Sequence, residues 1–180
     1  MSDELLDLLD EHGNPTGQTA TRSEVHANRL WHRSVHVWVV NTKGEILIQK
    51  RSPLKDLSPN RWELSHGGHL EAGQQPLDGA IREVKEELGI DLAPEQLEYC
   101  FETTHRSKRS PNNEFNPIFL AVLNLPISAF TFDDGEVSEL RWMDQPELEA
   151  WTQREPDIFA LHTDEEPQML TLIRQRFGAK

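Results

Sequence analysis

The sequence is poor in cysteine and has no long apolar segment. Cys100 is the only cysteine, which excludes an intrachain disulfide and a cysteine-based zinc site. No apolar run approaches the roughly 18 residues that a membrane-spanning helix needs. Residues 1–7 are acidic, unlike a signal or transit peptide. These absences predict a cytoplasmic protein without a membrane partner.

Basic residues are also scarce: 18 Lys and Arg stand against 31 Asp and Glu, for a net charge of −13. A chain with this charge repels nucleic-acid phosphates, so no nucleic-acid partner is predicted. It can still bind a phosphorylated small molecule where divalent cations neutralise the phosphates. Because the same charge would also serve solubility alone, a functional prediction depends on where particular carboxylates lie.

The 180 residues fit one domain, 1–180, in which strands and helices alternate. The fold class predicted from this alternation is α/β or α+β. A β-hairpin is expected in 4–22, with its turn at Gly13-Asn14-Pro15, and the capping-box spacing of Thr21 and Glu24 predicts a helix over 22–28. A second β-hairpin is expected from 34–41 and 45–50, followed by a loop over 52–66 that leads to an extended segment at 62–65. Further strands are expected at 97–104, 115–123 and 140–143, and further helices at 145–154 and 165–177.

The clearest helix pattern covers 76–88. Pro76 suits the first helical turn and Gly89 suits a C-terminal cap. Apolar residues recur between these ends with helical spacing, at Ile81, Val84 and Leu88. The pattern therefore predicts an amphipathic helix whose other faces are free to carry polar groups.

Three glutamates, Glu83, Glu86 and Glu87, share one face of that helix at i, i+3 and i+4. Such like-charged neighbours cost about 0.2–0.5 kcal/mol per pair in an isolated helix, and a solvated acidic face is one explanation for them. The other is a site for Mg²⁺, which prefers carboxylate oxygens together with phosphate and water. A Gly67-Gly68 turn before the helix would let the backbone approach such a site closely.

The segment 68–90, which ends in Arg82-Glu83-Val84-Lys85-Glu86-Glu87-Leu88-Gly89-Ile90, resembles the Nudix box. That box is Gly, five residues, Glu, seven residues, then Arg-Glu-apolar-x-Glu-Glu-x-Gly-apolar. The resemblance extends over roughly 30–152. It implies a Nudix α/β/α sandwich around a mixed sheet, with an N-terminal extension in 1–33 that includes the hairpin and with C-terminal helices in 145–180.

The resemblance implies a role for each matching residue. Glu86 and Glu87 match the principal metal ligands, and Glu83 matches a further ligand or the general base. Gly67 matches a glycine whose carbonyl binds metal, and Arg82 matches an arginine that orients the carboxylates. The implied cofactor is Mg²⁺, or Mn²⁺ in its place, and the implied partner is a small phosphorylated substrate.

One box position departs from the family pattern, because Gln74 stands where the first Glu is expected. Gln74 can still accept a hydrogen bond from Arg82 but brings no charge, and Glu71 in the same loop is a candidate substitute. This departure keeps open a non-catalytic module that binds a nucleotide without cutting it.

Segments 31–38 and 113–119 resemble the Nudix branch that contains isopentenyl-diphosphate isomerase. Glu114 matches a glutamate that is catalytic and binds metal in the isomerase, and it is expected to face the box helix. The isomerase also needs a cysteine where this chain has Gly67, and it usually has a degraded box. Hydrolysis of a diphosphate bond in a nucleoside diphosphate or its derivative is therefore favoured, with isomerisation as the alternative.

Candidate substrate contacts lie beside the glycines. Lys50 and Arg51 stand at a strand end that faces them, and His69 follows them. His32 and His69 match isomerase positions that bind metal, whereas His26 and His36 are expected to be packed or exposed. The oligomeric state, monomer or homodimer, stays open, although the N-terminal hairpin could pair between subunits.

Overall fold

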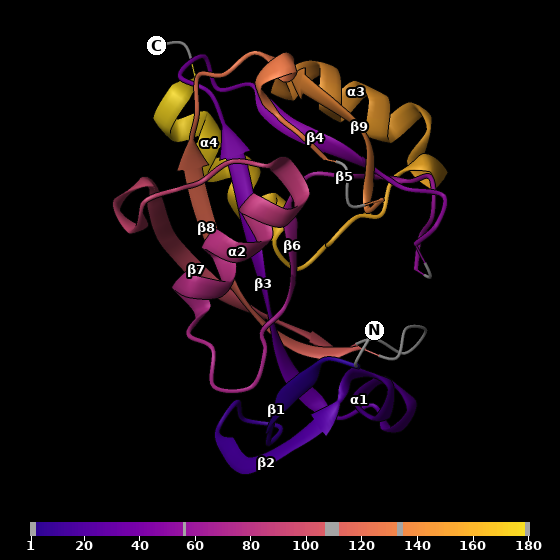
Figure 1. Ribbon diagram of the computed structural model, residues 1–180. Helices are drawn as coiled ribbons and strands as arrows, with labels where there is room; N and C mark the ends of the chain where they lie inside the picture. Colours follow the sequence, from indigo (N-terminus) through magenta and orange to yellow (C-terminus); the bar gives the residue numbers. More distant parts are fainter. Residues whose placement is uncertain (1–2, 56, 107–111, 133–134, 179–180) are drawn as a thin grey trace.

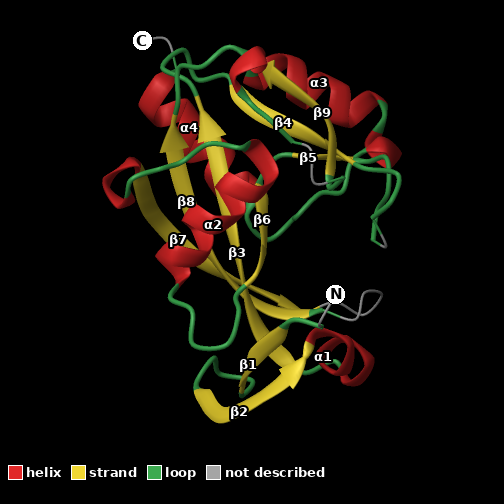
Figure 2. Ribbon diagram, in the orientation of Figure 1, coloured by secondary structure: helices red, strands yellow, loops and turns green. Residues whose placement is uncertain are grey.

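The computed structural model describes residues 3–55, 57–106, 112–132 and 135–178. Within them, four α-helices surround one sheet of nine strands (Figures 1 and 2). The strands are β1 Leu5–Leu9, β2 Pro15–Thr21, β3 Trp31–Val40, β4 Ile46–Arg51, β5 Trp62–Glu63, β6 His66–His69, β7 Leu97–Arg106, β8 Asn113–Val122 and β9 Val137–Met143, and the helices are α1 Arg22–Asn28, α2 Pro76–Leu88, α3 Gln145–Arg154 and α4 Glu166–Phe177.

Strand β3 organises the sheet. Strand β8 runs parallel to it along one edge, from the pair Trp31 and Asn113 to the pair Val40 and Val122. The other edge of β3 is shared by β1, β6 and β4, all antiparallel to it. The sheet continues from β4 to β5 and β9, from β8 to β7, and from β1 to β2. The predicted mixed sheet is therefore confirmed.

Each face of the sheet packs against helices. Val35, Val37 and Val39 of β3 belong to the core that includes Ala80, Val84 and Leu88 of α2. The alternating residues Trp38 and Val40 belong to a second core with Leu148 of α3 and Met169 and Ile173 of α4. Figure 1 accordingly shows α2 in front of β3 and α4 behind it. This confirms the predicted α/β/α sandwich.

The predicted hairpin of β3 and β4 is correct at its turn and wrong beyond it. The Asn41 side chain accepts hydrogen bonds from the amides of Lys43 and Glu45 and so fixes the turn. Only one residue pair follows, Val40 with Ile46, before the strands diverge. Because they diverge, β6 can pair with β3 while β5 and β9 pair with β4. Side chains from these diverging strands form the candidate site.

The Gly67-Gly68 segment is part of an extended strand, β6, and the predicted turn is wrong. Gly67 pairs with His36 and Gly68 with Val35. A Cβ atom on Gly67 would lie 1.9 Å from the Val35 carbonyl oxygen, and one on Gly68 would lie 2.7 Å from Oε1 of Glu83. Glycine is thus required here for close approach, not for an unusual φ.

The N-terminal hairpin and the helix after it form as predicted. Thr21 Oγ1 accepts a hydrogen bond from the Glu24 amide, and Glu24 Oε2 accepts one from the Thr21 amide, which completes the capping box. Strand β1 is also fixed to the loop before α2, because the amide of Gly73 donates to Asp7 Oδ2 at 2.7 Å. No helix among the described residues is long and apolar enough to cross a membrane.

Candidate active site

Two of the three glutamates on α2 are buried. The helix begins at Pro76 and ends at Gly89, whose φ of +67° suits glycine. Its packing on the sheet leaves Glu83 6% exposed and Glu87 3% exposed, whereas the Glu86 side chain is 53% exposed. A solvated acidic face therefore accounts for Glu86 alone, and the burial of the other two carboxylates requires compensation.

Arg82 supplies part of that compensation. Its Nη2 lies 2.7 Å from Glu83 Oε1, and its Nη1 donates to Glu86 Oε2 at 2.6 Å. Nη2 also donates to the carbonyl oxygen of His69 at 2.8 Å. Burial lowers the pKa of Arg82, but the two glutamates outweigh it and raise that pKa. Arg82 thus holds two carboxylates of its own helix in position against β6.

The electrostatics of the buried pair favour a cation. Burial raises the pKa of Glu83 to about 8, the charge of Glu87 adds to the shift, and Arg82 opposes it. A divalent cation would offset this cost of ionising two neighbouring carboxylates. The donor set is entirely oxygen, which suits a hard cation such as Mg²⁺.

Glu87 is held by the Gly67 backbone and by Gln49, a residue that the sequence did not indicate. The Gln49 side chain donates to Glu87 Oε2 at 3.1 Å, and the Gly67 amide donates to the same oxygen at 3.2 Å. The buried ring of His66 lies beyond them, with Nδ1 3.5 Å from that oxygen. Gln49 lies two residues after Leu47 on β4 and therefore shares the strand face on which Leu47 packs with α2. It could have been identified only by knowing that this face of the strand meets α2.

Gln74 does not accept the hydrogen bond from Arg82 that its amide oxygen could take. Gln74 Oε1 instead accepts from the amide of Glu71 at 3.1 Å and closes the loop locally. Arg82 uses the backbone carbonyl of His69 in its place. Glu71 is exposed and has no ion pair or hydrogen bond to Arg82, although its charge contributes to the raised pKa of that arginine. The loop therefore supplies no direct replacement for the family's first glutamate.

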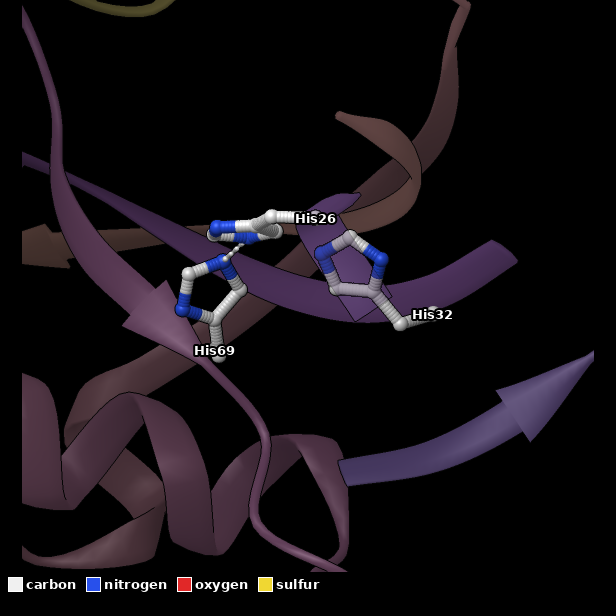
Figure 3. A group of neighbouring side chains, drawn as sticks. All are labelled: His26, His32 and His69. Atoms are coloured by element: carbon white, nitrogen blue, oxygen red, sulfur yellow. Dashed lines mark hydrogen bonds between the residues drawn. The ribbon is translucent and has the colours of Figure 1, made fainter. Parts of the chain in front are cut away.

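A second group of candidate ligands consists of His26 on α1, His32 on β3 and His69 on β6. One ring nitrogen from each lies within 4.8 Å of the others, and Figure 3 shows the three rings gathered together. Nε2 of His26 and Nε2 of His69 are 3.2 Å apart. Glu114 Oε1 lies 3.4 Å from His32 Nε2 and 3.7 Å from His69 Nε2. His26 is packed against the rings of His32 and His69, so a ligand role for it, which the sequence did not favour, becomes a candidate.

The protonation of this imidazole cluster suits metal binding. Burial lowers the pKa of His26 to about 4 and also lowers the pKa of His69, so both rings are neutral at neutral pH. His32 Nδ1 donates to the Leu30 carbonyl, and its buried Nε2 faces Glu114 Oε1 at 3.4 Å. Although burial opposes it, hydrogen bonds from His32 and His69 hold the pKa of Glu114 well below its usual range. Three imidazoles and a carboxylate fit Zn²⁺ or another first-row transition metal.

Glu114 does not face the box helix as expected. It pairs with His32 in the sheet, and His69 pairs with Ser34, whose hydroxyl donates to Glu114. These residues share the face of β3 that carries Trp38, whereas α2 packs on the other face. Because direction alternates along a strand, a carboxylate at this position meets the imidazole cluster and not the glutamates of α2.

Lys50 and Arg51 lie at the end of β4. Arg51 Nη1 donates to both carboxylate oxygens of Glu63 at 2.9 Å, and Nε donates to the Leu57 carbonyl. Although burial opposes it, hydrogen bonds from His162 and Arg51 lower the pKa of Glu63 to about 2. The charge of Arg51 is thus already balanced within the protein, whereas Lys50 is half-buried.

The chain before α4 covers the second face of the sheet. Glu165 accepts hydrogen bonds from Trp38 Nε1 at 3.0 Å and from His36 Nδ1 at 2.6 Å. Asp164 lies 2.9 Å from His105 Nδ1 on β7. Figure 1 shows this segment behind β6. His36 is therefore a packed residue, as expected.

The fold and the buried carboxylate helix define an α/β protein suited to divalent-cation chemistry. The sequence model of the NUDIX domain matches residues 30–162. The chain therefore belongs to the Nudix family, a class of hydrolases that act on phosphorus-containing anhydrides and generally use divalent metals. The predicted family is confirmed.

Several relatives support this assignment. Nudix hydrolase 3 of Arabidopsis thaliana is 35% identical over 98% of this chain, but the match covers only 24% of that longer protein. An uncharacterized Nudix hydrolase of Clostridium acetobutylicum is 36% identical over 89% of this chain and 80% of its own length. The isopentenyl-diphosphate Delta-isomerase of Shigella boydii is 32% identical over 80% and 79%.

Solved structures show the same fold. The Deinococcus radiodurans protein DR0079 superposes with a TM-score of 0.68 at 21% identity, covering 97% of this chain and 99% of that one. The MutT protein of Methanosarcina mazei gives a TM-score of 0.60 at 19% identity, covering 81% and 94%. At these identities the likeness concerns the fold alone.

Proposed function

We propose that the protein hydrolyses the diphosphate bond of a nucleoside diphosphate or of a nucleoside-diphosphate derivative with Mg²⁺ as cofactor. The observation that carries the proposal is the burial of Glu83 and Glu87 beside β6. Both carboxylates are nearly out of solvent, and Arg82 pairs with Glu83 and with the exposed Glu86 rather than with Glu87. Such a cluster is costly unless a cation joins it.

Each residue of the cluster has a part in the proposed reaction. Glu86, Glu87, Glu83 and the carbonyl of Gly67 hold the cation, and Arg82 fixes the orientation of two of these carboxylates. Bound Mg²⁺ neutralises the diphosphate and favours attack by water on phosphorus. Glu83 is also the candidate base for that water, since its buried carboxylate lies in the same cluster as the proposed ligands. Lys50 and Arg51 are proposed to contact the substrate, whereas His69, a further candidate from the sequence, projects from the other face of the sheet into the imidazole cluster.

The test is a panel of nucleoside diphosphates, nucleoside triphosphates and nucleotide sugars, incubated with pure protein and Mg²⁺. We expect phosphate or a nucleoside monophosphate to appear only when metal is present. Thermal stabilisation by a nucleotide with no product at any metal concentration would establish a binding module instead. A panel that neither reacts nor stabilises the protein would refute the proposal.

Isomerisation of isopentenyl diphosphate is the second candidate, and the imidazole cluster with Glu114 is the observation in its favour. The thiol that the isomerase requires is absent at Gly67, where a Cβ atom would clash with β3. The single cysteine, Cys100, lies on β7, and burial raises its pKa to about 11. Isopentenyl diphosphate therefore belongs in the panel. Conversion without release of phosphate would identify an isomerase.

We also propose that the imidazole cluster holds a transition metal separately from the Mg²⁺ site. Protein purified with a chelator-free buffer should contain about one equivalent of Zn²⁺ or another first-row metal by mass spectrometry. His32→Asn should remove that metal, whereas His105→Asn, a change to a histidine outside the cluster, should retain it. Equal metal content in both variants would contradict a site at these rings.

A further inference from the structure

Gln49 connects three parts of the candidate site. It lies on β4, is 2% exposed, and reaches across from the strand that diverges from β3. Its Nε2 donates to the carbonyl of Ser65, just before β6, and to Glu87 Oε2 on α2, both at 3.1 Å. A side-chain amide has two N–H groups, so each can serve one of these acceptors.

The contacts on Glu87 are unequal. Oε2 accepts from Gln49 and from the amide of Gly67, and the His66 ring lies next to it. Oε1 takes part in no hydrogen bond within the described residues. Two donors from different elements therefore fix the rotation of this carboxylate. Oε2 of Glu87 is therefore bound by the protein, and Oε1 remains available to a ligand.

The amide oxygen of Gln49 supplies a second, independent observation. It is buried and has no hydrogen-bond partner among the described residues. An unsatisfied buried acceptor costs about 1–3 kcal/mol, and such groups usually meet water or a ligand. A donor in the site, such as an ordered water, would satisfy it. Gln49 therefore holds Glu87 through its amide nitrogen and keeps a buried acceptor that no described residue satisfies.

We propose that Gln49 is a positioning residue for the divalent cation, because it holds Glu87 so that Oε1 faces the metal site. This inference rests on the metal-dependent activity proposed above. Residues that orient a metal ligand typically contribute about 10–100-fold to metal affinity or activity, although they do not touch the metal. Because an amide does not titrate, this contribution is independent of pH.

The chain contains a matched control in Gln145 at the start of α3. This glutamine is also buried, and its Nε2 also donates to one carboxylate and one carbonyl, Glu149 Oε1 and Leu170 O, both at 3.2 Å. Its contacts lie among α3 and α4. Gln145→Met therefore has a comparable cost in packing and hydrogen bonds but leaves Glu87 untouched.

The experiment measures Mg²⁺ and Mn²⁺ dissociation constants by calorimetry for the wild type, Gln49→Met and Gln145→Met, together with melting temperatures in a chelator. We expect a Kd weaker by about 10–100-fold in Gln49→Met and unchanged within about two-fold in Gln145→Met. Gln49→Asn shortens the amide by one methylene and should weaken binding similarly if Gln49→Met fails to fold. Hydrolysis at saturating Mg²⁺ should recover most of kcat, since the defect concerns metal affinity.

The outcomes separate this inference from the proposed function. A folded Gln49 variant with a wild-type Kd would overturn the inference even if the protein hydrolyses nucleotides. Weakened binding in a protein that hydrolyses none of the panel would support the positioning role and refute the proposed reaction. A wild type that binds neither cation would refute both.

Discussion

Glu87→Gln and Glu86→Gln are each expected to lower kcat/KM for diphosphate hydrolysis by about 1,000-fold or more, equivalent to about 4 kcal/mol at the transition state. Each change removes one negative ligand from the proposed cation site and keeps the side-chain volume. Glu87 is buried and held by Gln49 and Gly67, whereas Glu86 is exposed and held by Arg82. Steady-state kinetics over a range of Mg²⁺ concentrations will measure the loss.

Asp78→Asn is the control for both variants. Asp78 is an exposed carboxylate in the first turn of the same helix, so its removal changes charge without touching the buried cluster. We expect its kcat/KM to stay within about two-fold of wild type, in line with a surface substitution. Unchanged activity in Glu87→Gln or Glu86→Gln would show that the carboxylates of α2 are not the catalytic metal site.

The helix that carries these glutamates could be predicted closely because its ends are local. Pro76 and Gly89 fix the first turn and the cap through their own backbone preferences, and helical spacing places the apolar side. The same is true of α1, whose start depends on the reciprocal contacts of Thr21 and Glu24. Interactions between residues close in the sequence can therefore be predicted from the residue types and their spacing.

The rest of the site depends on contacts between distant residues. Two glycines in β6 predict a turn by local preference, but pairing with β3 holds them extended. The imidazole cluster joins three elements, and His26 enters it only because α1 is docked beside β3 and β6. Gln49 meets Glu87 because β4 diverges from β3, which a hairpin pattern does not reveal. Tertiary packing determines the extended glycines, the position of His26 and the contact of Gln49 with Glu87.

The sheet separates two groups of candidate ligands that differ in chemistry, the carboxylates of α2 and the imidazole cluster. The carboxylates of α2 approach β6 at Gly68 on one face, whereas His69 projects with Glu114 on the other. An all-oxygen group favours Mg²⁺, and an imidazole-rich group favours a softer metal. The backbone of β6 is common to both, so its glycines are the positions where a small change should have the largest effect.

Gly67→Ala and Gly67→Cys are expected to destabilise the protein by about 3 kcal/mol or more, the upper range for overpacking. The added Cβ would lie 1.9 Å from the Val35 carbonyl oxygen and 2.9 Å from its carbonyl carbon. These are backbone atoms of the central strand, so relief requires β6 to move away from β3. Urea denaturation in the presence of a chelator will measure the loss. Gly67→Cys should therefore not yield an isomerase by supplying a thiol.

Gly68→Ala is the matched comparison, because it adds the same methyl group one residue along the same strand. The three atoms nearest to its Cβ would be those of the Glu83 carboxylate, at 2.7–2.9 Å, and the end of a side chain can move. We expect a stability loss below about 1.5 kcal/mol but a kcat/KM lower by about 100-fold, since the displaced carboxylate belongs to the proposed cation site. Substitution of Gly67 would then mainly lower stability, whereas substitution of Gly68 would mainly lower activity. A Gly67→Cys protein with wild-type stability would instead show that β6 accommodates a side chain at this position, and only the absence of a thiol would then disfavour isomerisation by the wild type.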